Sequence, residues 1–174
     1  MKSIATLLFF TVGISLGITA QENSNNSQRL PSVNVKMLNG KTISTDQLQN
    51  DGKPMIISFW ALWCKPCIKE LTTIADVYPE WIEETGVKIY AVSIDDARSS
   101  AKVAPFVNGK AWEYEVLLDA NSDFKRAMNV NFIPHTFLIN GQGEIVWQHT
   151  SFSEGSELEL IEMVRKLNRG ESIE

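Results

Sequence analysis

The chain has 174 residues, a formal net charge of −5, and apolar and charged fractions of 44% and 21%. These values are typical of a globular protein with one domain, and a second independent core is not expected. Acidic and basic residues are interspersed, so the sequence contains neither the basic stripe that nucleic acids require nor a polybasic patch for an anionic membrane surface. We therefore expect no nucleic-acid partner.

The N-terminal segment has the three-part pattern of a secretory signal. Lys2 precedes an uncharged stretch of apolar or small residues, 4–20, and a polar stretch, 21–29, follows. We interpret residues 1–20 as a signal peptide and residues 21–29 as a flexible linker. An uncleaved N-terminal anchor is the alternative, because the apolar stretch only reaches the lower limit of a spanning helix, about 17 residues. In either case we expect the protein to work in the periplasm or at the outer face of the cytoplasmic membrane.

The rest of the sequence predicts strands and helices in alternation. Asn39-Gly40 is typical of a hairpin turn between two short strands, and the apolar run at 55–60 is typical of a central strand covered on both faces. This order predicts an α/β fold, a mixed central sheet flanked by helices, in one domain at residues 30–170. In chain order, the expected elements are strands at 33–38, 41–44 and 55–60, a helix after the two cysteines, a strand at 87–94, a helix at 98–107, a strand at 116–118, a helix at 121–128, strands at 135–139 and 144–149, and a helix at 156–168.

The two cysteines, Cys64 and Cys67, enclose a very small loop. A disulfide that closes so short a loop restricts the unfolded chain little, so stability is a weak reason for an exported protein to keep it. A structural zinc site needs four ligands, of which this pair supplies two, and His135 and His149 are too far apart in the sequence to form the usual histidine pair. We therefore favour redox chemistry over an inert disulfide or a zinc site, and we expect no metal and no cofactor beyond the cysteine pair.

The junction between the buried strand and the following helix favours dithiol–disulfide exchange. Cys64 stands at the expected helix start, where unpaired N–H groups and the helix dipole stabilise a thiolate, and Lys65 adds a positive charge. The thiolate attacks a disulfide, and Cys67, one turn further on, is placed to resolve the mixed disulfide. Pro66 lies in the first turn, where the missing N–H of proline costs little. Trp63, directly before the pair, is expected to line a surface that faces the substrate.

Glu70 is a candidate for acid–base work. It lies at the edge of the apolar stripe that the same helix forms with Cys67, Leu71, Ile74 and Tyr78. A partly buried carboxyl at that position would move a proton to or from Cys67. A solvated charge at the boundary of the stripe is the alternative, and the residues alone favour neither.

The segment before the strand at 135–139 holds the remaining candidates. A cis bond at Ile133-Pro134 would expose the Ile133 backbone to an extended substrate segment, although most X–Pro bonds are trans. His135 is a candidate for tuning the thiolate, although a histidine at a strand end is more often a bystander. His149 receives no role from the sequence.

Residues 59–67, Phe-Trp-Ala-Leu-Trp-Cys-Lys-Pro-Cys, resemble the active-site run of thioredoxins, and specifically of the exported TlpA/ResA-like branch. Ile-Pro-His-Thr-Phe-Leu-Ile at 133–139 is similar to the cis-proline strand of that family, and Asn-Gly-Gln-Gly at 140–143 is similar to the turn that follows it. The resemblance extends from about Leu30 to about Asn168. A Cys-x-x-Cys pair alone is a weak signal, but together with the downstream proline segment it becomes specific.

The resemblance implies a thioredoxin-like fold with an N-terminal hairpin and an inserted central helix within 95–117. It implies a redox-active Cys64–Cys67 disulfide, with Cys64 as the nucleophile and Cys67 as the resolving thiol. It also implies that Pro134 is cis and that Glu70 has an acid–base role. Two departures from the family stand out: Ser58 replaces the buried aspartate of cytosolic thioredoxins, and His135 replaces a threonine that many relatives carry.

The function implied by the resemblance is disulfide exchange with protein substrates outside the cytoplasm, in the reducing direction, as in cytochrome c maturation. A membrane protein would supply the electrons, and the protein is expected to be a monomer. Pro66 resembles the dipeptide of reducing thioredoxins, whereas Lys65 stabilises the thiolate and so makes the pair more oxidising. A disulfide-forming oxidase or isomerase is therefore the enzymatic alternative. A non-catalytic module that binds metal is the alternative of a different class.

Overall fold

The structure of the protein is a computed structural model that describes residues 28–173. The predicted signal peptide and most of the predicted linker lie outside the described residues. Within residues 28–173, none of the helices combines the length and the apolar composition that crossing a membrane requires.

Seven strands form one mixed sheet in the order β2-β1-β5-β4-β3-β6-β7. β3 pairs with β4, and β4 with β5, in parallel, while the pairs at both sides of this parallel core are antiparallel. All residues of the central strand β3 are buried, as the apolar run predicts. The strands are β1 (Asn34–Met37), β2 (Thr42–Ser44), β3 (Met55–Trp60), β4 (Lys88–Ser93), β5 (Glu115–Leu118), β6 (His135–Ile139) and β7 (Ile145–Thr150).

The N-terminal hairpin forms where the sequence predicts it. Gly40 adopts a positive φ of 84°, a conformation that costs glycine little. Its N–H donates to the carbonyl of Met37 at 2.9 Å, and the N–H of Met37 donates to Lys41 at 2.8 Å. The turn thereby fixes the register of β1 against β2, and the hairpin forms one side of the sheet.

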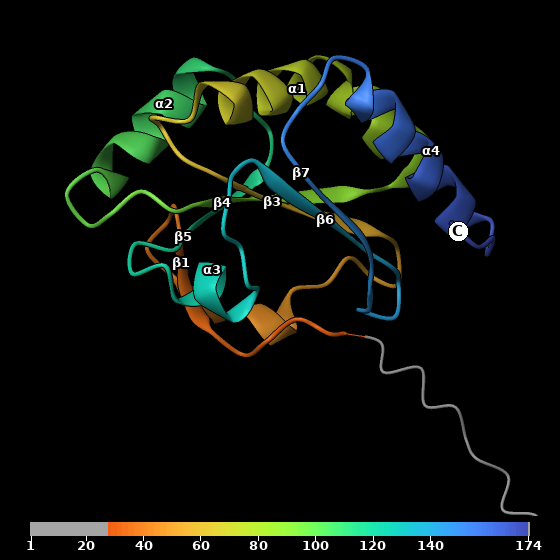
Figure 1. The fold of residues 1–174 in the computed structure, drawn as a ribbon, viewed down its shortest axis with the longest axis horizontal. Helices are drawn as coiled ribbons and strands as arrows, with labels where there is room; N and C mark the ends of the chain where they lie inside the picture. The colour runs from red at the N-terminus through yellow and green to blue at the C-terminus, as the bar shows by residue number, and fades with distance from the viewer. Residues whose placement is uncertain (1–27, 174) are drawn as a thin grey trace, which may run out of the picture.

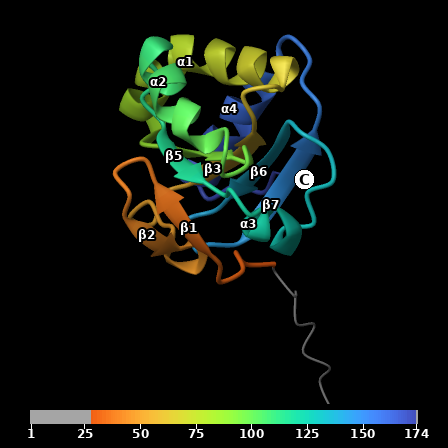
Figure 2. The same cartoon turned by 90° about the vertical axis from the view of Figure 1, so that its left-hand side faces the viewer.

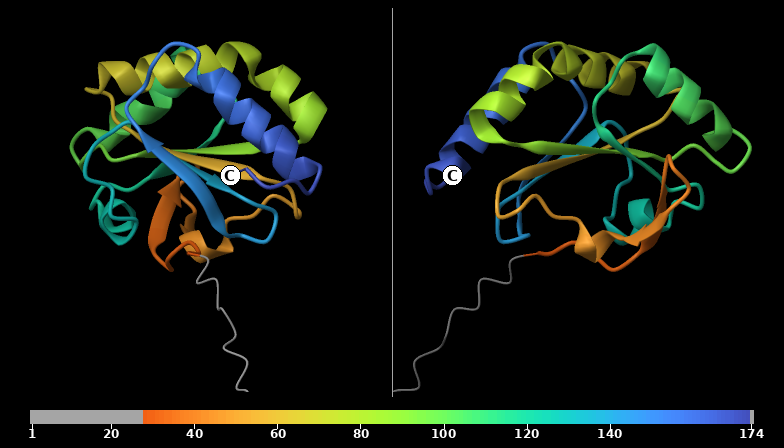
Figure 3. Two further views of the ribbon diagram at one scale, coloured as in Figure 1. Left: turned by 45° about the vertical axis from the view of Figure 1, so that its right-hand side comes forward. Right: turned by 180° about the vertical axis from the view of Figure 1, so that it is seen from behind.

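Helices cover both faces of the sheet, as expected from the order of the elements. Three of them lie together on one face, and a short helix lies on the opposite face (Figures 1, 2 and 3). The first group contains α1 (Lys65–Thr85), α2 (Val103–Gly109) and α4 (Ser156–Asn168), and the short helix is α3 (Asp123–Ala127). Two 3-10 turns, η1 (Thr45–Gln47) and η2 (Ser100–Lys102), complete the elements.

The inserted helix between β4 and β5 begins later than the sequence predicts. Regular structure begins with η2 at Ser100 and continues as α2, whereas the apolar pattern predicts a helix over 98–107. The side chain of Asp96 explains the difference, because its Oδ1 accepts the N–H groups of Arg98 and Ser99 at 3.1 and 2.9 Å. Such a side-chain turn competes with the helix for backbone donors and delays the helix start.

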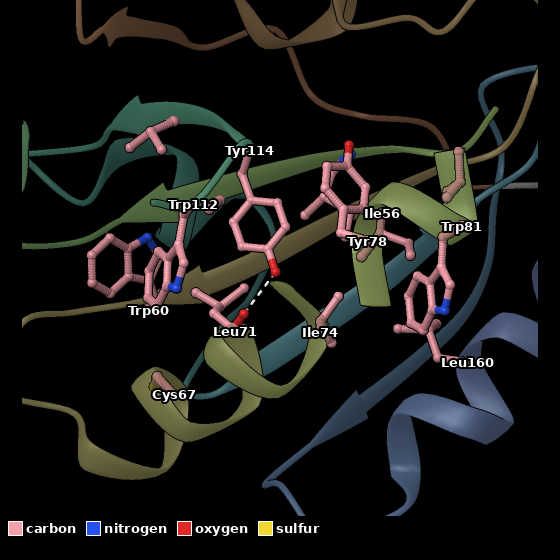
Figure 4. Close-up of a cluster of buried hydrophobic side chains, with 14 of the residues drawn as sticks. Ile56, Trp60, Cys67, Leu71, Ile74, Tyr78, Trp81, Trp112, Tyr114 and Leu160 are labelled. Carbon is pink, nitrogen blue, oxygen red and sulfur yellow. Dashed lines mark hydrogen bonds between the residues drawn. The ribbon is translucent and has the colours of Figure 1, made fainter. Parts of the chain in front are cut away.

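The larger hydrophobic core fills the space between the sheet and the group α1, α2 and α4 (Figure 4). Aromatic rings dominate it near α2: the ring centroids of Trp60 and Trp112 lie 5.1 Å apart. The hydroxyl of Tyr114, the residue before β5, donates to the carbonyl of Leu71 at 2.6 Å and so ties the start of that strand to α1. Both cysteines are buried members of this same core, with Cys64 5% exposed and Cys67 completely buried.

Ordered pairing begins just before the predicted domain boundary. Gln28 accepts the N–H of Ile145 at 2.8 Å, and Arg29 forms an isolated bridge with Glu144. These two residues, the last of the predicted linker, therefore contact the start of β7.

The packing of α1 against the sheet gives a stability prediction. We expect Leu71→Ala to lower the free energy of unfolding by about 2–5 kcal/mol, because the side chain is fully buried and a cavity would remain. Leu158→Ala on α4 is the control: this leucine is exposed, so the loss should stay within about 0.5 kcal/mol. Equal losses in urea denaturation would contradict this description of the core.

Candidate active site

Cys64 and Cys67 form a disulfide at the start of α1. Cys64 is the N-cap of the helix, and its Sγ accepts the backbone N–H of Cys67 at 3.3 Å. Lys65 and Pro66 follow on the exposed side of the first turn. The helix start therefore presents to Cys64 the N–H groups and the positive end of the dipole that favour a thiolate. This is the placement that the sequence predicts for the nucleophile.

The turn that leads into Cys64 is held by a buried carboxylate. Asp95 Oδ2 accepts the N–H of Leu62 at 3.0 Å and the hydroxyl of Ser93 at 2.9 Å. The N–H of Cys64 in turn donates to the carbonyl of Ala61 at 3.0 Å. Sequence reasoning gave Asp95 no functional role. Its position two residues after the end of β4 was the available signal, since the carboxyl ends of neighbouring parallel strands meet at one edge of a sheet.

Glu70 is more buried than the amphipathic pattern indicates, with a side-chain exposure of 2%. It lies one helical turn after Cys67. Thr136 Oγ1 donates to Glu70 Oε1 at 3.0 Å and lies 3.2 Å from Ser58 Oγ. The Nε2 atom of His149 lies 3.2 Å from the same Oε1, while Oε2 is buried without a hydrogen-bond partner in the described structure. A solvated boundary charge is therefore the wrong alternative for Glu70.

His149 is the residue that sequence reasoning missed. The antiparallel register of β6 and β7 places it directly opposite Thr136, so both side chains point to the face of the sheet that α1 covers. Its ring also contacts Trp147 edge-on, with centroids 4.7 Å apart. The predicted hairpin of two alternating strands was the signal, but a pairing register was needed to bring His149 to Glu70.

Ile133-Pro134 lies at the same edge of the sheet as Cys64. Because β3 and β6 pair antiparallel, with Phe59 opposite His135, the residues that follow β3 and those that precede β6 meet at one end of the sheet. The Ile133-Pro134 peptide bond is cis, as the resemblance implies. The structure thus brings the predicted cis-proline segment to the end of the sheet where α1 and the cysteines begin.

Two large aromatic side chains are exposed in the segments that contain the cysteines and the cis-proline. Trp63 directly precedes Cys64 and is 68% exposed, in line with the predicted substrate-facing position. Phe132, just before Ile133, is 77% exposed and was not singled out by sequence reasoning. Because these two side chains lie in the segments that carry the cysteines and the cis-proline, both are candidates for contact with a substrate protein.

The structure does not bring His135 to Glu70. His135 alternates with Thr136 along β6 and therefore points to the opposite face, where its ring stacks on Phe137 with centroids 4.3 Å apart. Its Nε2 lies 3.0 Å from Gln148 Oε1. Burial lowers the pKa of His135, which favours the neutral ring. Its predicted tuning of the thiolate stays a prediction.

Among residues 28–173, no group of three or more His, Cys, Asp and Glu side chains is placed to hold a metal ion.

Comparison with known proteins is consistent with this geometry. Residues 27–148 match the AhpC/TSA family. The chain is 32% identical over 148 residues to the thiol-disulfide oxidoreductase ResA of Bacillus thuringiensis (strain Al Hakam), with 83% of each chain covered. It is 31% identical over 126 residues to ResA of Bacillus subtilis (strain 168), covering 72% of this chain and 68% of that protein.

Solved structures give the same result for the fold. A thioredoxin-like protein from Porphyromonas gingivalis is 55% identical, with a TM-score of 0.73, and the match covers 80% of this chain and 92% of that one. StoA from Bacillus subtilis, at 24% identity and a TM-score of 0.59, shares the fold over 76% of this chain and 97% of its own. The family match contains both cysteines, the buried glutamate and the cis-proline. The chain therefore belongs to the thioredoxin-like AhpC/TSA family, and within it to the ResA-like thiol–disulfide oxidoreductases.

Proposed function

We propose that the protein reduces disulfides of other proteins outside the cytoplasm, and that a membrane protein returns the electrons to it. The cysteine pairs of apocytochromes during cytochrome c maturation are the substrate class that we propose. The observation that carries the exchange reaction is the position of Cys64, which caps α1 beside the exposed Trp63. The secretory pattern of residues 1–20 supports the location.

The reaction needs only the groups already described. In the reduced protein, the Cys64 thiolate attacks one sulfur of the substrate disulfide, and the other substrate sulfur leaves and takes up a proton. Cys67 then gives its proton to Glu70 and attacks Cys64 Sγ. The Cys64–Cys67 bond forms, and the bond from Cys64 to the substrate breaks. The substrate gains two electrons and the cysteine pair loses them, so no further cofactor is required, and one copy of the chain is sufficient.

The reducing direction follows from weighing two opposing features of the active-site turn. Pro66 resembles the dipeptide of reducing thioredoxins, whereas Lys65 stabilises the reduced form through its charge. Lys65 is exposed, so water and salt weaken its effect on the thiolate. We therefore give Pro66 the larger weight.

The direction is tested by the reduction potential of the cysteine pair, measured by equilibration with a dithiol buffer at pH 7. We expect a value near the thioredoxin end of the scale, roughly −270 mV. A value near the strongly oxidising end, roughly −120 mV, would instead make the protein a disulfide-forming enzyme.

The order of the two thiols is tested by trapping. We expect reduced Cys67→Ser to accumulate a covalent adduct with a disulfide-bonded peptide, because Cys64 attacks and nothing resolves the intermediate. The matched variant Cys64→Ser should form no adduct, because Cys67 is completely buried, whereas Cys64 caps the helix start and keeps 5% exposure. Mass spectrometry under non-reducing conditions measures both. An adduct of comparable yield in Cys64→Ser would show that the roles are reversed.

The expectation that Lys65 has only a small effect on the reduction potential is tested by removing its charge. We expect Lys65→Gln to lower the potential by about 4–20 mV, because an exposed charge pair contributes about 0.2–1 kcal/mol and 30 mV corresponds to about 1.4 kcal/mol. Lys69→Gln is the control, since that amine is exposed and pairs with Glu154. A shift well beyond this range, or an equal shift in the control, would contradict the weighting.

A further inference from the structure

Four polar side chains form a continuous chain between α1 and the sheet. Ser58 Oγ lies 3.2 Å from Thr136 Oγ1, which donates to Glu70 Oε1 at 3.0 Å, and His149 Nε2 lies 3.2 Å from that oxygen. They come from β3, β6, α1 and β7 respectively. Every neighbouring pair is within hydrogen-bond distance, so the Glu70 carboxyl group contacts Thr136 on one side and His149 on the other.

The two ends of this chain differ in their access to water. Ser58 and Thr136 have relative exposures of 1% and 0%, so that end is closed. The side chain of His149 is 20% exposed, compared with 2% for Glu70. Among the described side chains bonded to the Glu70 carboxylate, His149 is the one that reaches the surface.

Within the described residues, two titratable side chains near Glu70, Tyr114 and His135, offer no second exit for the proton. Tyr114 donates its hydroxyl to the carbonyl of Leu71, and burial raises its pKa far above the ordinary value, so it holds its proton. His135 lies on the opposite face of β6, where its Nε2 meets Gln148. Neither group has a hydrogen bond to the carboxylate.

We propose that His149 is a positioning residue that carries the proton between Glu70 and solvent during disulfide exchange. The proposal rests on the proposed function, because it assigns the route for the proton that the resolving thiol gives up. When Cys67 attacks Cys64, its proton passes to Glu70, and Glu70 passes it to Nε2 of the neutral imidazole. The imidazolium then releases the proton on Nδ1 to water, which leaves a neutral ring with its proton on Nε2. When the cysteine pair is reduced again, the same transfers run in reverse and restore the starting tautomer. A histidine suits this step because its two nitrogens accept and donate at different edges of the ring.

His149→Ala tests the proposed proton route, because a proton carrier added to the buffer should replace the lost imidazole. The probe is oxidised glutathione, reacted with the reduced protein at pH 7 in weak buffer, followed by acid quench, thiol alkylation and mass spectrometry. We expect the glutathione adduct of Cys64 to resolve roughly tenfold more slowly than in the wild type, less than the about 100-fold or more that loss of an acid–base group itself can cost. Added imidazole at constant ionic strength should restore the rate in the variant and leave the wild type unchanged.

A double-variant comparison shows whether His149 acts through Glu70. Glu70→Gln should slow resolution further and should not respond to imidazole, since the group that takes the proton from Cys67 is gone. Adding His149→Ala to Glu70→Gln should then cause no additional loss. An additive loss, or a slow rate that imidazole does not restore, would show that His149 is only structural and would overturn the proposal.

His149→Gln keeps the test decisive if the alanine variant fails to fold. Its amide can still donate to the Glu70 carboxylate, but it cannot carry a proton. Slow resolution with an unchanged melting temperature supports the relay, and the wild-type rate overturns it. Failure of the wild type to exchange disulfides with glutathione would instead overturn the proposed function, so the two failures are distinguishable.

Discussion

The junction between β3 and α1 is the constraint on which the rest of the site depends. β3 is buried on both faces and ends at a fixed edge of the sheet, and α1 begins only a few residues later. The helix start is therefore held at one place, with Cys64 as its cap and both cysteines packed in the core. Asp95 fixes the connecting turn by accepting the Leu62 N–H. A reactive sulfur at a helix start needs this rigidity, because the field of the dipole falls off within a turn.

Placing Cys67 in the core has a consequence for protons. A thiol that must lose its proton inside a packed interior cannot give it to water, so a buried acceptor is needed. Glu70 meets that need one turn later on the same helix, but an ionised carboxylate taken out of water is costly unless it is hydrogen-bonded. Thr136 donates such a bond to one of its oxygens, and His149 Nε2 lies 3.2 Å from the same oxygen, where it donates only when it carries a proton. Ser58, which stands where cytosolic thioredoxins carry an aspartate, is part of the same chain of side chains.

Much of the fold follows from local pattern. Short sequence patterns are enough to predict three features: the apolar run of β3, the turn at Asn39-Gly40 and the apolar stripe of α4. The bounds of α4 agree with the prediction. Local competition explains the difference at α2, since the Asp96 side chain takes donors that the periodic pattern assigns to the helix. The redox role of the two cysteines can also be predicted from a local pattern, because it depends on their short spacing at the start of a helix.

The partners of Glu70 were beyond prediction because they depend on register. A strand alternates its side chains, so a shift of one residue between β6 and β7 would move His149 to the other face. The two histidines illustrate this parity. His135 looked the better candidate because it is next to the cis-proline, yet it stacks on Phe137 on the face away from Glu70. His149, which belongs to none of the motifs, lies against the carboxylate. The pairing register of β6 and β7 therefore decides which histidine contacts Glu70. The residues next to each histidine in the sequence do not specify that register.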